Sequence, residues 1–168
     1  MKRKYYFFIL LYGLLLVGVL LGYNNLYGSN VDWISQHVAF PDYFRELFYR
    51  TGNLIPNFAF NLGGGQNIFN FSYYGLMSPV ILVSYLFPFL EMKYYVMIIS
   101  LCLYLFSGML VFRFFDKHHY SESLSCFMGI IFLTLAPISF HFHYHIMFVW
   151  YYPFLLMALF GVDKYVKD

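Results

Sequence analysis

Residues 5–23 read YYFFILLYGLLLVGVLLGY, a run of 19 residues that contains no charged side chain. A helix of about 20 predominantly apolar residues is long enough to cross the hydrocarbon core of a membrane. The run follows Met1-Lys2-Arg3-Lys4, and a basic start before an apolar run is also typical of a secretory signal peptide. Because Gly22-Tyr23-Asn24-Asn25 offers no small-x-small cleavage site, we interpret the segment as a retained membrane anchor.

The whole chain has the composition of a membrane protein. Of its 168 residues, 61% are hydrophobic and 25% are aromatic, whereas only 11% are charged. Soluble domains contain about 25% charged residues, so this chain lacks the polar side chains needed to cover a water-facing surface. The net charge of +2 and the scattered basic residues give no indication of nucleic-acid binding. Cys102 and Cys126 lie in apolar runs and are interpreted as small hydrophobic side chains.

Three further apolar segments have the length of a membrane span. They are residues 94–112, 123–140 and 146–162. A fifth apolar stretch, residues 76–90, has only about 15 residues and contains Pro79 and Pro88, so it is marginal as a span.

The distribution of basic residues decides how residues 76–90 are placed. Cytoplasmic loops of membrane proteins carry an excess of Lys and Arg. If residues 76–90 do not span, seven basic residues fall inside and three outside; if they span, four fall inside and six outside. We therefore predict an all-α integral membrane protein with four transmembrane helices and both ends of the chain cytoplasmic. Residues 24–93 form a large outer loop, in which residues 76–90 are re-entrant or lie at the interface.

The outer loop holds most of the polar residues, and its first candidate is Asp32. On a helix Asp32 and Gln36 would share a face, with His37 next to Gln36. Two interpretations stay open. Asp32 caps the short helix that follows, which the spacing alone favours, or it acts as a general base at the membrane surface.

An amphipathic helix is predicted over residues 40–50. Apolar side chains recur at the helical period at Phe40, Tyr43, Phe44, Leu47 and Phe48. Pro41 suits the first turn. The polar face carries Asp42, Arg45, Glu46 and Arg50. We expect the helix to lie in the interface with its aromatic side in lipid or protein. Arg45 or Arg50 then either binds a lipid-linked phosphate in bidentate fashion or makes ordinary headgroup contacts.

Two further motifs are weaker. The stretch Asn61-Leu62-Gly63-Gly64-Gly65-Gln66-Asn67 matches no phosphate loop, although three glycines allow a turn close against a ligand. His141, His143 and His145 alternate in the turn between the third and fourth predicted spans. So short a turn rarely lets three histidines converge on zinc, and no carboxylate stands nearby. We interpret it as a polar, aromatic interface turn.

In their order, these pieces resemble the amino-terminal part of the bacterial YfhO-type membrane protein family, which belongs with the GT-C membrane glycosyltransferases. The resemblance rests on the acidic residue with Gln-His after the first span and on the glycine stretch leading into Tyr73-Tyr74-Gly75-Leu76-Met77-Ser78-Pro79. It rests also on Ser107-Gly108-Met109, in a span that ends at Arg113, and on Trp150-Tyr151-Tyr152-Pro153 before Gly161-Val162-Asp163-Lys164. Family members are several times longer, so residues 1–168 are expected to be the amino-terminal part of one polytopic domain with a partial GT-C fold, either as a fragment or as a truncated gene product.

The resemblance implies extracytoplasmic glycosylation at the bacterial cytoplasmic membrane, in which a sugar moves from polyprenyl phosphate to a cell-envelope polymer such as a teichoic acid. On this resemblance, Asp32 is expected to be the general base that deprotonates the acceptor hydroxyl, or otherwise to help hold the acceptor. The expected polar positioning groups are Gln36, His37 and Asn67, and Arg45 or Arg50 is a candidate contact for the phosphate. No Asp-x-Asp pair occurs in the outer loop, so neither a metal nor a cofactor besides the donor is indicated. The expected partners are membrane lipids, the lipid-linked sugar and the acceptor polymer, with no nucleic acid.

Two other function classes stay open. A transporter of lipid-linked substrates would also be polytopic and aromatic, but it should carry ionisable residues within its spans. The four predicted spans carry essentially none. A non-catalytic membrane scaffold is the other alternative, and it would tolerate loss of the Asp32 carboxylate.

Overall fold

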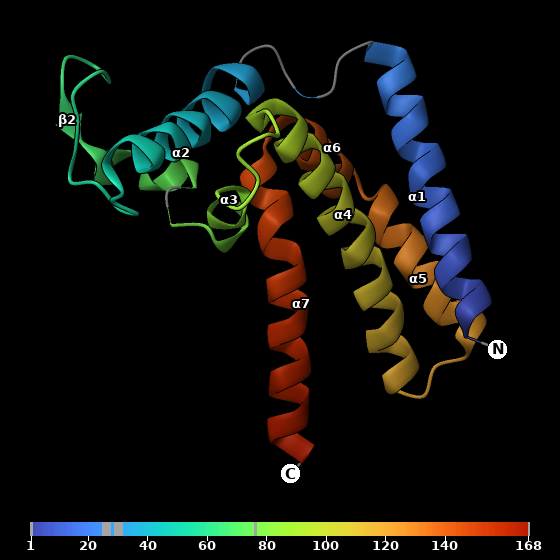
Figure 1. The fold of residues 1–168 in the computed structure, drawn as a ribbon. Coiled ribbons are helices and arrows are strands. Elements are labelled where there is room, and N and C mark those ends of the chain that lie inside the picture. The colour runs from blue at the N-terminus through green and yellow to red at the C-terminus, as the bar shows by residue number, and fades with distance from the viewer. Residues whose placement is uncertain (1, 25–27, 29–31, 76, 168) are drawn as a thin grey trace. The chain divides into compact units, whose positions relative to one another are not determined.

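The computed structural model describes residues 2–24, 28, 32–75 and 77–167, with the side chains of residues 20–24, 143 and 167 outside that description. Its contacts divide the chain into two compact units (Figure 1). Unit 1 consists of Met1–Gly28 and Ser100–Asp168, and unit 2 is Ser29–Ile99.

Long helices make up unit 1. They are α1 (Arg3–Asn24), the greater part of α4 (Met92–Lys117), α5 (Glu122–Thr134), α6 (Ala136–Tyr144) and α7 (Ile146–Lys167). Unit 2 is built from shorter elements: the π-helix η1 (Trp33–Val38), α2 (Ala39–Thr51), β1 (Phe58–Ala59), β2 (Gln66–Asn67), the 3-10 helix η2 (Ile68–Tyr74) and α3 (Pro79–Ser84). The two strands pair as an antiparallel hairpin.

The described residues contain two helices, α4 and α7, that are long and apolar enough to cross a membrane. The pair α5 and α6, bent by 55° at the break between them, gives a third candidate if it is one broken span. α1 covers the first predicted span with 22 residues. α3 has only six residues, far fewer than the roughly 20 that a helical span needs. Four complete spans and a re-entrant segment at residues 76–90 stay predictions.

The third predicted span is interrupted, and Pro137 explains why. Proline has no N–H to bond the carbonyl of Leu133, four residues earlier, and its ring crowds that carbonyl. The Leu133 carbonyl accepts a hydrogen bond from the Tyr104 hydroxyl on α4 instead. The buried Tyr104 ring also stacks on Phe142 of α6, with ring centroids 4.3 Å apart. Thus α4 supplies the hydrogen bond that the broken helix lacks, and packs against both of its halves.

Small residues let the helices of unit 1 approach closely, as is usual in membrane bundles. A Cβ added at Gly129 of α5 would lie 2.8 Å from the Gly108 carbonyl oxygen of α4 and 3.0 Å from the Ile9 side chain of α1. A Cβ added at Gly108 would lie 2.9 Å from the Leu133 side chain. The contact between α1, α4 and α5 therefore depends on the missing side chains of these two glycines.

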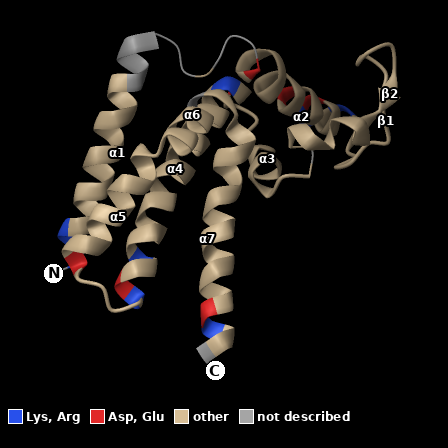
Figure 2. Ribbon diagram, turned by 180° about the vertical axis from the view of Figure 1, so that it is seen from behind, with Lys and Arg blue, Asp and Glu red and all other residues tan. Residues whose placement is uncertain are grey.

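Charged residues gather at one end of unit 1 (Figure 2). Lys2 pairs with Asp116 at 2.7 Å, which joins the start of the chain to the end of α4. Lys117 pairs with Asp163 at 2.8 Å, which joins the end of α4 to that of α7. The start of α1 and the ends of α4 and α7 therefore lie at the same end of the unit, as the predicted topology requires.

The close approach at Gly129 can be tested by Gly129→Ala. The added methyl group meets backbone that cannot easily move, so we expect a loss of about 1–3 kcal/mol of stability. Thermal unfolding of the purified chain in detergent measures this loss. Gly18→Ala on α1 is the matched control, because a Cβ there meets nothing within 4 Å. Equal unfolding midpoints for the two variants would show that the helices do not pack in this way.

Candidate functional site

The amphipathic helix predicted over residues 40–50 is confirmed as α2 (Ala39–Thr51). Pro41 lies in its first turn, and Gly52 ends it in the left-handed conformation at φ 69°, with its N–H donating to the Phe48 carbonyl. The aromatic side packs within unit 2, where Phe44 forms a buried cluster with Ala59 of β1 and Ile68 of η2. This part of the helix therefore contacts protein rather than lipid.

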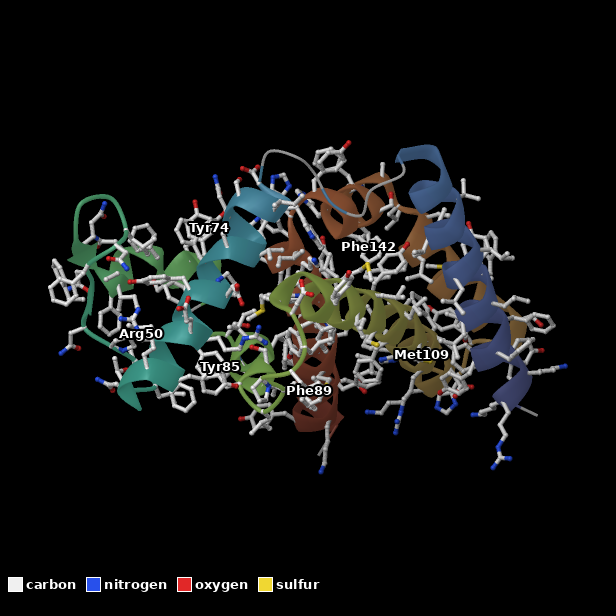
Figure 3. All side chains as sticks on the ribbon, turned by 45° about the horizontal axis from the view of Figure 1, so that its top comes forward. Arg50, Tyr74, Tyr85, Phe89, Met109 and Phe142 are labelled. Carbon is white, nitrogen blue, oxygen red and sulfur yellow. The ribbon has the colours of Figure 1, made fainter. Side chains whose placement is uncertain are left out.

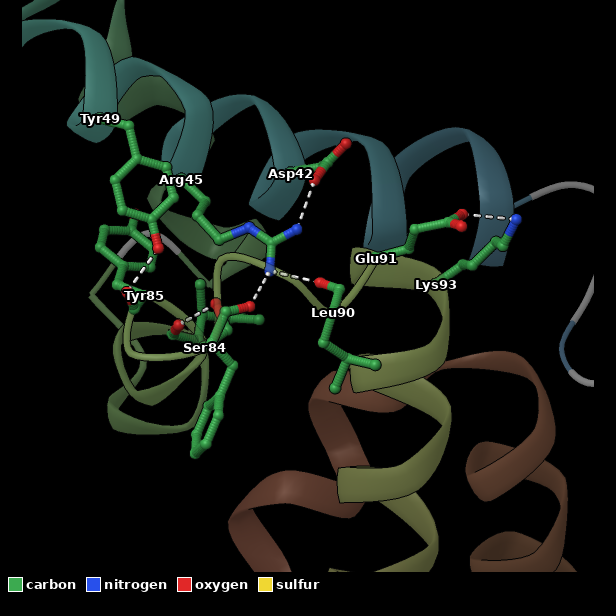
Figure 4. Close-up of polar contacts among 10 residues, drawn as sticks. Asp42, Arg45, Tyr49, Ser84, Tyr85, Leu90, Glu91 and Lys93 are labelled. Carbon is green, nitrogen blue, oxygen red and sulfur yellow. Dashed lines mark hydrogen bonds and ion pairs between the residues drawn. The ribbon is translucent and has the colours of Figure 1, made fainter.

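Arg45 has a different environment from the exposed polar face that the sequence predicts. The residue is only 6% exposed. Its guanidinium donates to the Asp42 carboxylate at 3.0 Å and to the Leu90 carbonyl at 2.8 Å (Figure 4). A longer contact of 3.4 Å reaches the Phe87 carbonyl. Arg45 thus holds the segment before α4 against α2, a structural role that the pattern of the helix alone does not reveal.

A small pocket of about 250 Å³ adjoins this arginine. Its polar lining consists of Asp42, Arg45, Glu91 and Lys93, and its apolar lining of Val38, Pro88, Phe89 and Met92. Glu91 and Lys93 pair with each other at 2.6 Å. The pocket therefore holds two cations and two carboxylates, a balanced set that suits polar groups of a ligand better than a lone anion.

Asp32 stands at the N-terminal end of the π-helix η1. Its backbone is in the right-handed helical region, and its side chain makes no capping hydrogen bond. The cap interpretation that the spacing favours is therefore not supported by the geometry. The Asp32 carbonyl accepts from the N–H groups of both Gln36 and His37 at 3.0 Å. π-Helical turns are rare and are found frequently at functional sites.

Gln36 and His37 lie on η1, the short helix that follows Asp32. Gln36 is half-buried, whereas His37 is only 2% exposed. The His37 imidazole lies 6.1 Å, centroid to centroid, from the Tyr74 ring at the end of η2. Of the predicted positioning groups, these two lie on the helix that begins directly after Asp32.

Asn67 and Arg50 lie elsewhere in unit 2. The Asn67 side chain caps η2 by accepting from the Phe69 N–H at 3.0 Å. Arg50 lies in the last turn of α2 and is exposed (Figure 3). Neither residue lines the pocket beside Arg45. The structure therefore gives Asn67 a structural task and leaves the Arg50 guanidinium open to solvent.

The glycine stretch forms the turn of the β1–β2 hairpin. Gly63, Gly64 and Gly65 all have positive φ, at 55°, 82° and 99°. L-residues rarely adopt this conformation, so three glycines in succession are explained by the turn itself. A ligand is not needed to account for them.

Several polar residues of unit 2 were not singled out from the sequence. Asp42, Glu91 and Lys93 line the pocket beside Arg45, and only Asp42 was placed on a helix face. Tyr85 is another: its hydroxyl is buried and has no hydrogen-bond partner in the part of the chain that the structure describes. Burial raises the pKa of Tyr85 to about 12, so the group stays neutral. Among these residues, the sequence offered a signal only at Glu91, an acidic residue just before the apolar segment that forms α4.

The histidine motif lies on and just after α6. His141 and His145 face each other, with their Nδ1 atoms 3.3 Å apart. The His143 side chain lies outside the described residues. Within the described ranges, no three His, Cys, Asp or Glu side chains gather in a way that could hold a metal ion.

The long apolar helices of unit 1 and the folded polar segment between α1 and α4 define a helical membrane protein. A profile of the family described as bacterial membrane protein YfhO matches residues 7–168, and the chain belongs to that family. Comparisons with curated proteins and with solved structures give no match.

The structural role of Arg45 can be tested by Arg45→Met. The substitution removes the charged hydrogen bonds of Arg45 and leaves the Asp42 carboxylate and two carbonyls without this partner. The free energy of unfolding of unit 2 should therefore fall by about 2 kcal/mol or more. When unit 2 opens and closes faster than a protease cleaves it, this loss corresponds to about 30-fold faster proteolysis of unit 2 in membrane vesicles. Arg50→Met removes an exposed arginine of the same helix and should leave the cleavage rate unchanged. Equal rates for both variants would contradict a structural role for Arg45.

Proposed function

We propose that this protein takes part in extracytoplasmic sugar transfer, moving a sugar from polyprenyl phosphate to a cell-envelope polymer such as a teichoic acid. Membership of the bacterial membrane protein YfhO family supports a membrane function. The resemblance of the family to GT-C glycosyltransferases supports the reaction class. In this proposal α1, α4, the α5–α6 pair and α7 each cross the cytoplasmic membrane, with unit 2 on the outer side.

The reaction requires a base and a leaving group. The acceptor hydroxyl oxygen attacks the anomeric carbon of the donor sugar and forms the new glycosidic bond. The bond between that carbon and the phosphate oxygen breaks, and polyprenyl phosphate leaves with the electron pair. The hydroxyl proton passes to the Asp32 carboxylate, the general base in this scheme.

The place of Asp32 is the observation that carries the proposal. It lies at the N-terminal end of a π-helix, and π-helical turns are rare and are found frequently at functional sites. Gln36 and His37 follow on the same turn as positioning groups for the acceptor. The guanidinium of Arg45 is already bonded to Asp42 and two carbonyls. Arg50 lies in the last turn of α2, roughly 16 Å along the helix axis from its first residue at 1.5 Å per residue. Neither arginine is therefore placed to hold the donor phosphate beside Asp32.

Asp32→Asn tests the role of the carboxylate. The substitution keeps the size and an amide oxygen but removes the proton acceptor. In cells whose own copy of the gene is deleted, we expect the variant to reach the membrane normally yet to support 10²- to 10⁴-fold less sugar transfer. Sugar analysis of the isolated envelope polymers measures the outcome.

Glu46→Gln is the matched control, because it neutralises an exposed carboxylate on α2 of the same unit. It should restore normal glycosylation. Normal glycosylation in the Asp32→Asn strain would show that Asp32 is not the base. Normal glycosylation in the deletion strain itself would show that the protein does not transfer the sugar at all.

A further inference from the structure

A large pocket opens at the charged end of unit 1, and none of the residues of the proposed sugar-transfer site lines it. Its volume is about 970 Å³, at the upper end of the range usual for ligand pockets. Its polar lining comprises Lys2, Arg113, Asp116, Lys117, His119 and Lys164. These residues come from the start of the chain, the end of α4 with the turn that follows, and the end of α7.

The charges at this pocket do not balance. Lys2 is paired with Asp116 and Lys117 with Asp163, at 2.7 and 2.8 Å. The bond to Asp116 raises the pKa of Lys2, which therefore stays cationic. Within the described ranges, Arg113 and Lys164 have no ion-pair partner, and both are exposed. The mouth of the pocket thus carries two cations in excess.

The apolar lining runs from these cations toward the middle of the predicted spans. On α4, Leu110 and Phe106 precede Arg113 by three and seven residues. On α7, Phe160 and Met157 precede Lys164 by four and seven. Residues at these spacings share one face of a helix. Both helices therefore present a cation at the end and two apolar side chains along the next two turns.

We propose that this pocket binds one anionic phospholipid of the cytoplasmic leaflet. Its phosphate lies between Arg113 and Lys164, and its acyl chains lie along Phe106, Leu110, Met157 and Phe160. Basic pockets between transmembrane helices on the cytoplasmic side suit such head groups. The apolar walls favour a lipid over a free phosphate ion, and the surplus of two cations favours an anionic lipid over a zwitterionic one.

The bound lipid would join the ends of α4 and α7, which the Lys117–Asp163 pair already links. This inference concerns the end of unit 1 at which the chain starts. It does not depend on Asp32 or on the proposed sugar transfer.

Native mass spectrometry of the purified full chain in detergent tests the proposal, with dioleoyl phosphatidylglycerol and dioleoyl phosphatidylcholine as probes. We expect one tightly bound phosphatidylglycerol. In the double variant Arg113→Gln, Lys164→Gln its affinity should fall about tenfold or more, with phosphatidylcholine binding unchanged. The charge-preserving double variant Arg113→Lys, Lys164→Arg should retain the lipid, which excludes a simple folding defect.

Arg3→Gln with Lys4→Gln is the matched control. It removes the same charge at the same end of unit 1 from residues that do not line the pocket, and it should leave phosphatidylglycerol binding intact. Equal losses in the two neutralised variants would mean general surface attraction and would overturn the proposal. Unchanged binding in the pocket variant, or displacement of the lipid by millimolar inorganic phosphate, would overturn it too.

Discussion

Peptide groups in the core of a bilayer have no water to bind, so each must find its hydrogen-bond partner within the protein. This constraint explains why the apolar segments of the chain are helices, and it becomes visible where a helix breaks. Pro137 leaves the Leu133 carbonyl without its partner inside the helix, and the Tyr104 hydroxyl of α4 takes that place. The same region depends on Gly108 and Gly129, whose missing side chains allow the backbones to approach closely enough. The break after α5 and the close packing of α1, α4 and α5 thus involve the same group of residues.

The long helices of unit 1 were predictable because apolar length is a property of the sequence alone. Residues 94–112 and 146–162 lie within α4 and α7, and residues 5–23 lie within α1. The 55° bend in the third segment was not predicted, although Pro137 signals a break. The hydroxyl that bonds the Leu133 carbonyl at the break belongs to Tyr104, which is 29 residues distant in the chain. Contacts of this kind follow from tertiary packing, and the periodicity of apolar residues in the sequence does not predict them.

In unit 2, too, the sequence predicted a helix but not the contacts of the polar side chains at the candidate site. The period of Phe40, Tyr43, Phe44 and Leu47 located α2 correctly, because one face of that helix is buried against the hairpin and η2. The pattern placed Arg45 on the polar face, but it could not show that the carbonyls of Phe87 and Leu90 return to bind it. Nor could spacing show that η1 is a π-helix or that Asp32 makes no capping bond. Local pattern defines elements, whereas the role of a polar side chain depends on what the rest of the chain brings to it.

The proposed topology has four spans, with unit 2 outside and the charged end of unit 1 inside. Cysteine labelling tests it directly. The native cysteines are first replaced by Cys102→Ser and Cys126→Ser, and single cysteines are introduced by Asn61→Cys in the hairpin and by Ser121→Cys before α5. An impermeant maleimide added to intact cells should label Asn61→Cys and should reach Ser121→Cys only after the membrane is permeabilised. Labelling of Ser121→Cys on intact cells would contradict this topology, and with it the places of both proposed sites.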